Sequence, residues 1–234
     1  MKLSFKNLIA SCKDDFKVAF RFHGATEITY DSFYKDCINV AEKLKTIAGN
    51  NVMICSPYSY KWIISYFGAL LADKTAVLPP DNITSEDLLK LCDRYRISYV
   101  IHGDSSSSTV RIIPAINSSH AISTVIFTSG TEGFPKGVAL SEKGLLCSAY
   151  YSVQRLGLNE TDIVIHTLPF SHAFGLAAEI IAVIMSKATL CFGKKLGMLP
   201  IDISTFKPTV MFSVPAVLKG ILTYIDNNTS LRKV

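Results

Sequence analysis

The chain has 234 residues, of which 49% are hydrophobic, and a mean hydropathy of +0.30, which excludes disorder and predicts one large globular domain or two small ones. The net charge of +5 is not gathered into a basic stripe, which excludes a nucleic-acid partner. Six scattered cysteines contain no C-x-x-C pair, which predicts free thiols in a reducing, cytoplasmic compartment.

The N-terminal half alternates β-branched runs with helical patterns. Strands are predicted at residues 18–22, 27–29, 51–55, 75–78 and 99–101, the first two as a hairpin around Gly24. After Tyr30 the period becomes helical, with one face made of Phe33, Cys37, Val40 and Leu44. The next helix has a face made of Tyr60, Ile63, Ile64 and Phe67. Ser85, followed by two acidic residues, predicts a further helix start.

The C-terminal half continues the same alternation. Residues 105–108 are four serines and predict a surface loop. Strands are predicted at residues 122–127, 137–140, 163–166, 188–192 and 209–212. Ser141 is expected to cap a helix whose apolar side carries Leu145, Ala149, Val153 and Leu156. This order predicts an α/β fold of parallel-rich sheets sandwiched by helices.

Membrane insertion and secretion are not indicated. The two most apolar windows, residues 62–72 and 175–186, are too short to span a bilayer, and Glu179 interrupts the second. The N-terminus shows no charged region followed by an apolar run, so no secretory signal and no transmembrane segment are expected.

The segment with the most chemical information is 128–137, Thr-Ser-Gly-Thr-Glu-Gly-Phe-Pro-Lys-Gly, between two apolar strands. Its glycines let backbone N–H groups approach a ligand, its hydroxyl groups add donors, and Lys136 adds a positive charge. These groups suit a polyphosphate. The nucleotide P-loop is excluded because no Gly-Lys-Ser/Thr opens a helix here, and no Gly-x-Ser-x-Gly nucleophile elbow is present. A plain glycine-rich hairpin turn is the structural alternative.

This segment resembles the signature loop of the adenylate-forming superfamily, which includes acyl-CoA synthetases, firefly luciferase and nonribosomal-peptide adenylation domains. The resemblance extends over nearly the whole chain, through residues 28–30, 168–176 and 208–215. The chain departs from the family pattern at Ala72-Asp73 and at Ser141-Glu142-Lys143, neither of which is a phosphate contact.

The resemblance implies that the loop binds ATP. Residues expected to contact the nucleotide phosphates are Thr128, Ser129, Gly130, Thr131, Glu132, Gly133, Pro135, Lys136 and Gly137. Among them, Lys136 is the expected catalytic cation on the departing pyrophosphate. No cluster of ligand side chains forms a metal site, so Mg²⁺ is expected to enter with ATP.

A second site is implied by residues 168–176. His172 is expected to be catalytic, near the reacting carbonyl, and the acyl pocket is expected to contain Phe170, His172, Phe174 and Gly175. A core role remains open for His172 and for both aromatic residues, and His166 is interpreted as structural. A serine hydrolase is disfavoured because Ser171 and His172 are adjacent and no acid is placed to orient the histidine.

The expected reaction is activation of a carboxylic acid by ATP as an acyl-adenylate, followed by transfer to CoA. The resemblance further implies that residues 1–234 are the incomplete N-terminal large domain of an AMP-dependent synthetase or ligase, without the C-terminal lysine domain. Alone, such a fragment is expected to be inactive and to self-associate through its uncovered surface. Two alternatives remain: an adenylation domain that loads a carrier-protein thiol, and a non-catalytic nucleotide-binding module.

Overall fold

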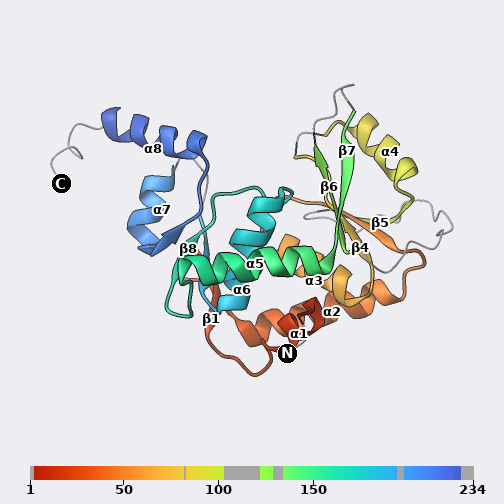
Figure 1. Cartoon of the computed structure of the whole chain (residues 1–234), viewed down its shortest axis with the longest axis horizontal. Coiled ribbons are helices and arrows are strands. Elements are labelled where there is room, and N and C mark those ends of the chain that lie inside the picture. Colours follow the sequence, from red (N-terminus) through yellow and green to blue (C-terminus); the bar gives the residue numbers. More distant parts are fainter. Residues whose placement is uncertain (1–2, 82, 103–121, 129–133, 194–197, 228–234) are drawn as a thin grey trace.

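The computed structural model of the chain describes residues 3–81, 83–102, 122–128, 134–193 and 198–227. Its strands form two sheets with helices around them (Figure 1). The strands are β1 (Val18–Phe22), β2 (Glu27–Thr29), β3 (Asn51–Cys55), β4 (Thr75–Val77), β5 (Ile97–His102), β6 (Thr124–Thr128), β7 (Lys136–Leu140), β8 (Ile163–Ile165), β9 (Thr189–Phe192) and β10 (Val210–Met211). The helices are α1 (Phe5–Ala10), α2 (Tyr30–Lys45), α3 (Tyr60–Leu71), α4 (Ser85–Arg94), α5 (Glu142–Leu156), the π-helical η1 (Gly175–Ile181), α6 (Ala182–Ser186), α7 (Leu199–Phe206) and α8 (Pro215–Asn227).

Each sheet has five strands within the described part of the chain. One has the order β10-β8-β9-β1-β2 and the other β5-β3-β4-β6-β7. All neighbours are parallel except β1–β2 and β6–β7, the last pair of each sheet. The predicted α/β architecture with parallel-rich sheets is therefore confirmed, and so is the hairpin around Gly24, whose φ of +85° suits a glycine turn.

Alternate residues of the buried strands face two different cores. In β3, Val52 and Ile54 belong to the main core, whereas Met53 faces a smaller core beneath α4. In β8, Val164 faces the main core and Ile165 faces a third one with α7 and α8. The main core thus lies between the two sheets, and each sheet has a further helical layer on its outer face.

The helices between the sheets are buried on more sides than their sequence pattern indicates. We expected one buried face of α3, including Tyr60 and Ile64, but these two side chains are only half-buried. Trp62 and Tyr66, outside that predicted face, are fully buried and stack with ring centroids 5.5 Å apart. The single-face prediction is wrong because α1, α2 and the sheet surround α3.

Local signals at the helix starts are largely confirmed. Ser141 caps α5, and its side chain accepts a hydrogen bond from the backbone N–H of Gly144. Helix α4 begins at Ser85 as predicted, but the capping oxygen is that of Thr84, which accepts from the N–H of Asp87.

Further details differ from the sequence predictions. Leu156 was expected on the buried side of α5, yet it is 56% exposed, because the helix ends there at Gly157 in the left-handed conformation and extends beyond its cover. The strand expected at 209–212 is shortened to Val210–Met211. The serine loop at 105–108 lies outside the described residues.

No helix in the described ranges combines the length and the apolar character needed to cross a membrane.

Gly68 of α3 packs closely against α2. A Cβ added there would lie 2.4 Å from Cγ1 of Val40. We therefore expect Gly68→Ala to lower the free energy of unfolding by about 1–3 kcal/mol through overpacking, despite the better helix propensity of alanine. Urea denaturation measures this change. The matched control is Gly220→Ala in α8, where nothing lies within 4 Å and a gain of up to about 1 kcal/mol is expected. Equal effects at the two positions would refute the overpacking argument.

Candidate functional site

The candidate site lies at the edge where the parallel strands β3, β4, β5 and β6 end. Cys55 at the end of β3 is paired with His102 at the end of β5, and Thr128 ends β6 at the same edge. Ligands of open α/β sheets bind outside the carboxyl ends of the strands. The glycine-rich segment leaves the sheet at this edge.

The described parts of that segment form the base of a hairpin. Thr128 pairs with Lys136 across the antiparallel strands β6 and β7, and Thr128 Oγ1 lies 3.5 Å from the Lys136 carbonyl oxygen that it donates to. Both residues and Gly137 are exposed, and Pro135 is half-buried. The predicted phosphate contacts Ser129, Gly130, Thr131, Glu132 and Gly133 lie outside the described residues. Lys136 therefore lies exposed at the start of β7, opposite the end of β6.

The turn after β8 places its predicted residues in different surroundings. His172 is exposed, and Phe174 is 50% exposed with its ring 6.3 Å from that of Phe212. Phe170 is fully buried, with ring centroids 4.3 Å from His166 and 4.9 Å from Tyr58. The side chain of Phe170 thus packs as a core residue.

Gly175 opens η1 behind this turn, where a Cβ would lie 2.2 Å from the carbonyl oxygen of Pro169. The position thus needs glycine for packing, because the two backbone segments are in close contact. The two predicted acyl-pocket residues that reach the surface here are His172 and Phe174.

Glu179 organises the same segment from within the core. Its side chain is fully buried in η1, and Oε2 lies 2.6 Å from Nδ1 of His166. Oε1 accepts a hydrogen bond of 2.8 Å from the backbone N–H of Thr167, and the N–H of Leu168 reaches both oxygens at 3.3 Å. Buried carboxylates need such compensation, so Glu179 fixes the backbone that leads to His172. The contact between His166 and Glu179 supports the structural role expected for His166.

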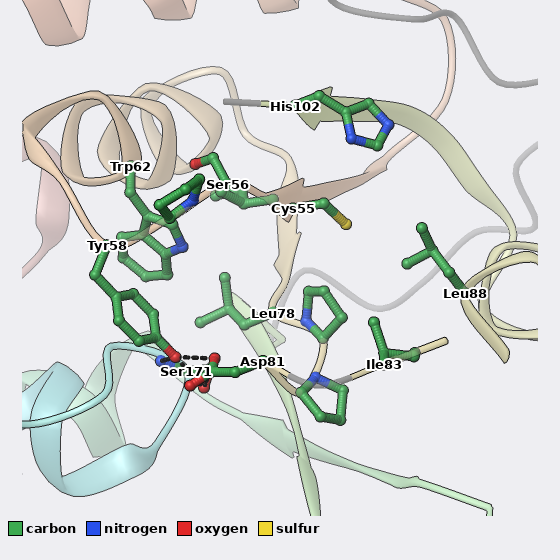
Figure 2. Close-up of a pocket in the computed structure, with 14 residues that line it drawn as sticks. Cys55, Ser56, Tyr58, Trp62, Leu78, Asp81, Ile83, Leu88, His102 and Ser171 are labelled. Carbon is green, nitrogen blue, oxygen red and sulfur yellow. Dashed lines mark hydrogen bonds between the residues drawn. The ribbon is translucent and has the colours of Figure 1, made fainter. Parts of the chain in front are cut away.

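A pocket of about 550 Å³ opens between the strand ends and this turn (Figure 2). Its lining residues are Ile54, Cys55, Ser56, Pro57, Tyr58, Trp62, Leu78, Pro79, Pro80, Asp81, Ile83, Leu88, His102 and Ser171. Burial raises the pKa of the Cys55 thiol to about 12, which keeps it protonated at neutral pH and unsuited to nucleophilic attack.

Three polar side chains meet at one side of the pocket, as Figure 2 shows. The Tyr58 hydroxyl donates to Asp81, and its oxygen lies 2.7 Å from Ser171 Oγ, which is 3.2 Å from the same Asp81 oxygen. Burial, and then the hydrogen bond to Asp81, raises the pKa of the Tyr58 hydroxyl well above its usual value. This cluster joins loops of both sheets next to His172. Sequence reasoning missed Tyr58 and Asp81, although Pro79-Pro80-Asp81 directly after a strand was a usable signal.

A wider, open groove of about 910 Å³ lies on the other side of the turn. Its lining residues are Ser148, Tyr151, Ser152, Gln154, Arg155, Leu156, Phe174, Ala178 and Phe212. Tyr151 is 69% exposed and Leu156 56% exposed, so the groove presents apolar side chains to the surface. Since Ser171 lines the pocket and Phe174 lines the groove, the turn with His172 lies between the two.

Across the described ranges, no group of three or more His, Cys, Asp or Glu side chains is arranged to hold a metal ion.

The chain is similar in sequence to known proteins. The family model described as "AMP-binding enzyme" matches residues 104–234, which is more than half of the chain. Long chain acyl-CoA synthetase 8 of Arabidopsis thaliana is 24% identical over 201 residues, covering 78% of this chain and 28% of the relative. Long-chain-fatty-acid–CoA ligase 1 of Schizosaccharomyces pombe is 26% identical over 172 residues, covering 65% of this chain and 24% of the relative. The chain thus spans about a quarter of the length of these two relatives.

Solved structures show the same fold. O-succinylbenzoate coenzyme A synthetase (MenE) from Bacillus subtilis, in complex with AMP, superimposes with a TM-score of 0.77 at 18% identity, over 95% of this chain and 64% of that one. ATP-bound MatB from Rhodopseudomonas palustris gives a TM-score of 0.71 at 18% identity, over 92% of this chain and 50% of that one.

The contacts of Glu179 generate a stability prediction. Glu179→Gln keeps the side-chain volume but turns one acceptor into a donor that faces His166 and backbone N–H groups. We expect the free energy of unfolding to fall by about 1.5–3 kcal/mol, measured by chemical denaturation. The control is Glu160→Gln, an exposed partner of Lys17, for which a change below about 1 kcal/mol is expected. Losses of equal size at both sites would show that the buried network does not depend on the carboxylate.

Proposed function

The chain belongs to the AMP-binding enzyme family, and from this premise we propose that it serves an acyl-CoA synthetase that activates a carboxylic acid with ATP and transfers the acyl group to CoA. Because the chain covers only 28% of the Arabidopsis relative, the activity is proposed for the protein with all the regions that such a synthetase needs. In that view residues 1–234 belong to the N-terminal large domain.

The observation that carries the proposal is the hairpin at the carboxyl edge of the parallel sheet. It sets Thr128 opposite Lys136 and leaves seven positions between them with two hydroxyl-bearing residues and two glycines. Hydroxyl and backbone N–H donors beside an exposed lysine suit the β- and γ-phosphates of ATP. The relatives whose names include ATP or AMP share this fold.

The proposed chemistry begins with attack of the substrate carboxylate on the α-phosphate of ATP. A P–O bond forms to the carboxylate oxygen, and the bond to the β-phosphate oxygen breaks, so pyrophosphate leaves with the extra negative charge. Ser129, Thr131 and Lys136 stabilise that charge, and the loop glycines bring their N–H groups close to it. In the second step the thiolate of CoA attacks the acyl carbonyl, and AMP leaves. Mg²⁺ is carried by the ATP phosphates.

The acyl group is assigned to the apolar groove beside His172. Phe174 lines this groove, and the exposed His172 lies two residues before it in the chain, which agrees with the role expected for both near the acid. An open apolar groove suits an alkyl chain better than a charged amino acid, and the relatives named above are long-chain acyl-CoA synthetases. We therefore assign a fatty acid as the substrate.

The thiol acceptor and the location complete the proposal. CoA is preferred to a carrier-protein thiol because the relatives are CoA synthetases by name. Cytoplasmic location is supported by six free cysteines in the structure. The main alternative is a nucleotide-binding module without catalysis, which predicts ATP binding without pyrophosphate exchange.

Lys136→Ala tests the proposed role at the phosphates. In the protein expressed from the complete coding region, we expect ATP–pyrophosphate exchange to slow by about 10²–10³-fold, because a charged donor to the leaving group is lost. Lys143→Ala removes the same charge from the exposed first turn of α5 and is expected to keep the wild-type rate. An unchanged rate in Lys136→Ala contradicts the assignment. ATP binding with no exchange in the wild-type protein favours the non-catalytic module.

Ser152→Trp tests the groove. Ser152 lines it from α5, and an indole there would occupy the space of several methylene groups. Each methylene is worth about 0.8 kcal/mol on burial, so kcat/KM for palmitate relative to octanoate should fall by more than about tenfold. Lys143→Trp, on the same helix but outside the groove, should leave the ratio unchanged. An unchanged ratio in Ser152→Trp would exclude the groove as the acyl site.

A further inference from the structure

The strand that carries Lys136 is weakly covered. In the described part of the chain, β7 is the last strand of its sheet and pairs only with β6. Four of its five residues, from Lys136 to Ala139, are exposed. Edge strands with little cover open easily, so the direction of the Lys136 side chain depends on whatever holds this strand from its other side.

Tyr95 provides such a contact from a distant part of the chain. Its hydroxyl oxygen accepts a hydrogen bond of 2.8 Å from the backbone N–H of Gly137, the residue after Lys136. Tyr95 directly follows α4 and is itself fixed at two further points. Its ring packs edge-on against Phe127 with centroids 5.2 Å apart, and its carbonyl oxygen accepts a 2.6 Å hydrogen bond from Asn51 Nδ2. The hydroxyl is thus a rigid acceptor.

The contact with Tyr95 requires that residue 137 has no side chain. A Cβ at that position would lie 2.5 Å from Oη and 2.7 Å from Cε1 of Tyr95. Its φ is not in the left-handed region, so glycine is needed here for close approach and not for an unusual backbone conformation. The last glycine of the predicted phosphate loop therefore has a packing partner outside the loop.

A second contact from the same helix end lies on the other side of Lys136. The guanidinium of Arg94 is 5.7 Å from the centroid of the Phe134 ring, within the range of a cation–π interaction. Arg94 and Tyr95 are consecutive, and they contact residues 134 and 137, which flank Lys136. Residues at the end of α4 thus contact the chain on both sides of Lys136, at Phe134 before β7 and at Gly137 within it.

We propose that Tyr95 is a positioning residue for Lys136: its hydroxyl fixes the backbone of Gly137 and thereby aims the lysine at the phosphates. This inference rests on the proposed function, in which Lys136 stabilises the leaving pyrophosphate. Stabilisation of a leaving group requires donors that are already in place, because reorganisation during the reaction costs free energy. A lysine on an unsupported edge strand would lose part of that advantage.

The first experiment is Tyr95→Phe in the complete protein, which keeps the ring and its contact with Phe127. We expect kcat/KM for ATP in pyrophosphate exchange to fall about three- to tenfold, as for the loss of one hydrogen bond, with the KM for the carboxylic acid unchanged. The control is Tyr60→Phe, which removes a hydroxyl bonded to Asp36 at 2.6 Å between α2 and α3. It should leave kcat/KM for ATP as in the wild type. Wild-type kinetics in Tyr95→Phe would overturn the proposal.

A double-mutant cycle separates positioning from a general structural role. If Tyr95 acts through Lys136, Tyr95→Phe should cause no further loss in a Lys136→Ala background. A loss of the same factor in both backgrounds would overturn the proposal, because Tyr95 would then act independently of the lysine.

Amide hydrogen exchange tests the contact without any assay of activity. The N–H of Gly137 should exchange at least about threefold faster in Tyr95→Phe than in the wild-type chain, while that of Gly144 in α5 stays unchanged. Equal protection of Gly137 in both proteins would overturn the proposal. If the wild-type protein shows no pyrophosphate exchange at all, the proposed function fails. The amide hydrogen exchange of Gly137 still decides whether Tyr95 holds the strand.

Discussion

The structure depends on one layer of helices that is buried between two sheets. Both sheets turn alternate side chains toward this layer, so that Val52 from one sheet and Val164 from the other belong to the same core. Helices in such a position must be apolar on nearly every side, as the full burial of Trp62 and Tyr66 in α3 shows. Polar chemistry is consequently displaced to the edges of the sheets, where strands end and loops reach the surface.

Glu179 is the main departure from that rule, and its position is informative. A carboxylate in the central layer carries a desolvation cost, which its contacts with His166 and two backbone N–H groups offset. Through those contacts the core fixes the turn that exposes His172 between the pocket and the groove. Stability and the placement of His172 therefore depend on the same buried acid.

The two proposed halves of the site are supported in a similar way, by residues far away in the sequence. The turn after β8 is tied to the other sheet through Tyr58, Asp81 and Ser171, and the lysine strand is tied to α4 through Tyr95. In both cases an exposed segment rests on side chains that are themselves fixed by packing. This is the arrangement that catalysis of adenylate formation would need, since substrates must approach freely while the charged donors stay in place.

The sequence by itself determined where most strands lie and where α5 begins, because these follow from neighbouring residues. Alternation of β-branched residues predicted the strands. Ser141 predicted the start of α5, because its side chain bonds the N–H of Gly144, only three residues further along the chain. It also pointed to the glycine-rich segment between β6 and β7 by composition alone. The division of the strands into two sheets was decided only by the tertiary structure, as were the burial of Phe170 beside the exposed His172 and the fit of Gly137 against Tyr95. Gly137 and Tyr95 are 42 residues apart, and no local pattern records a contact that arises when distant elements pack together.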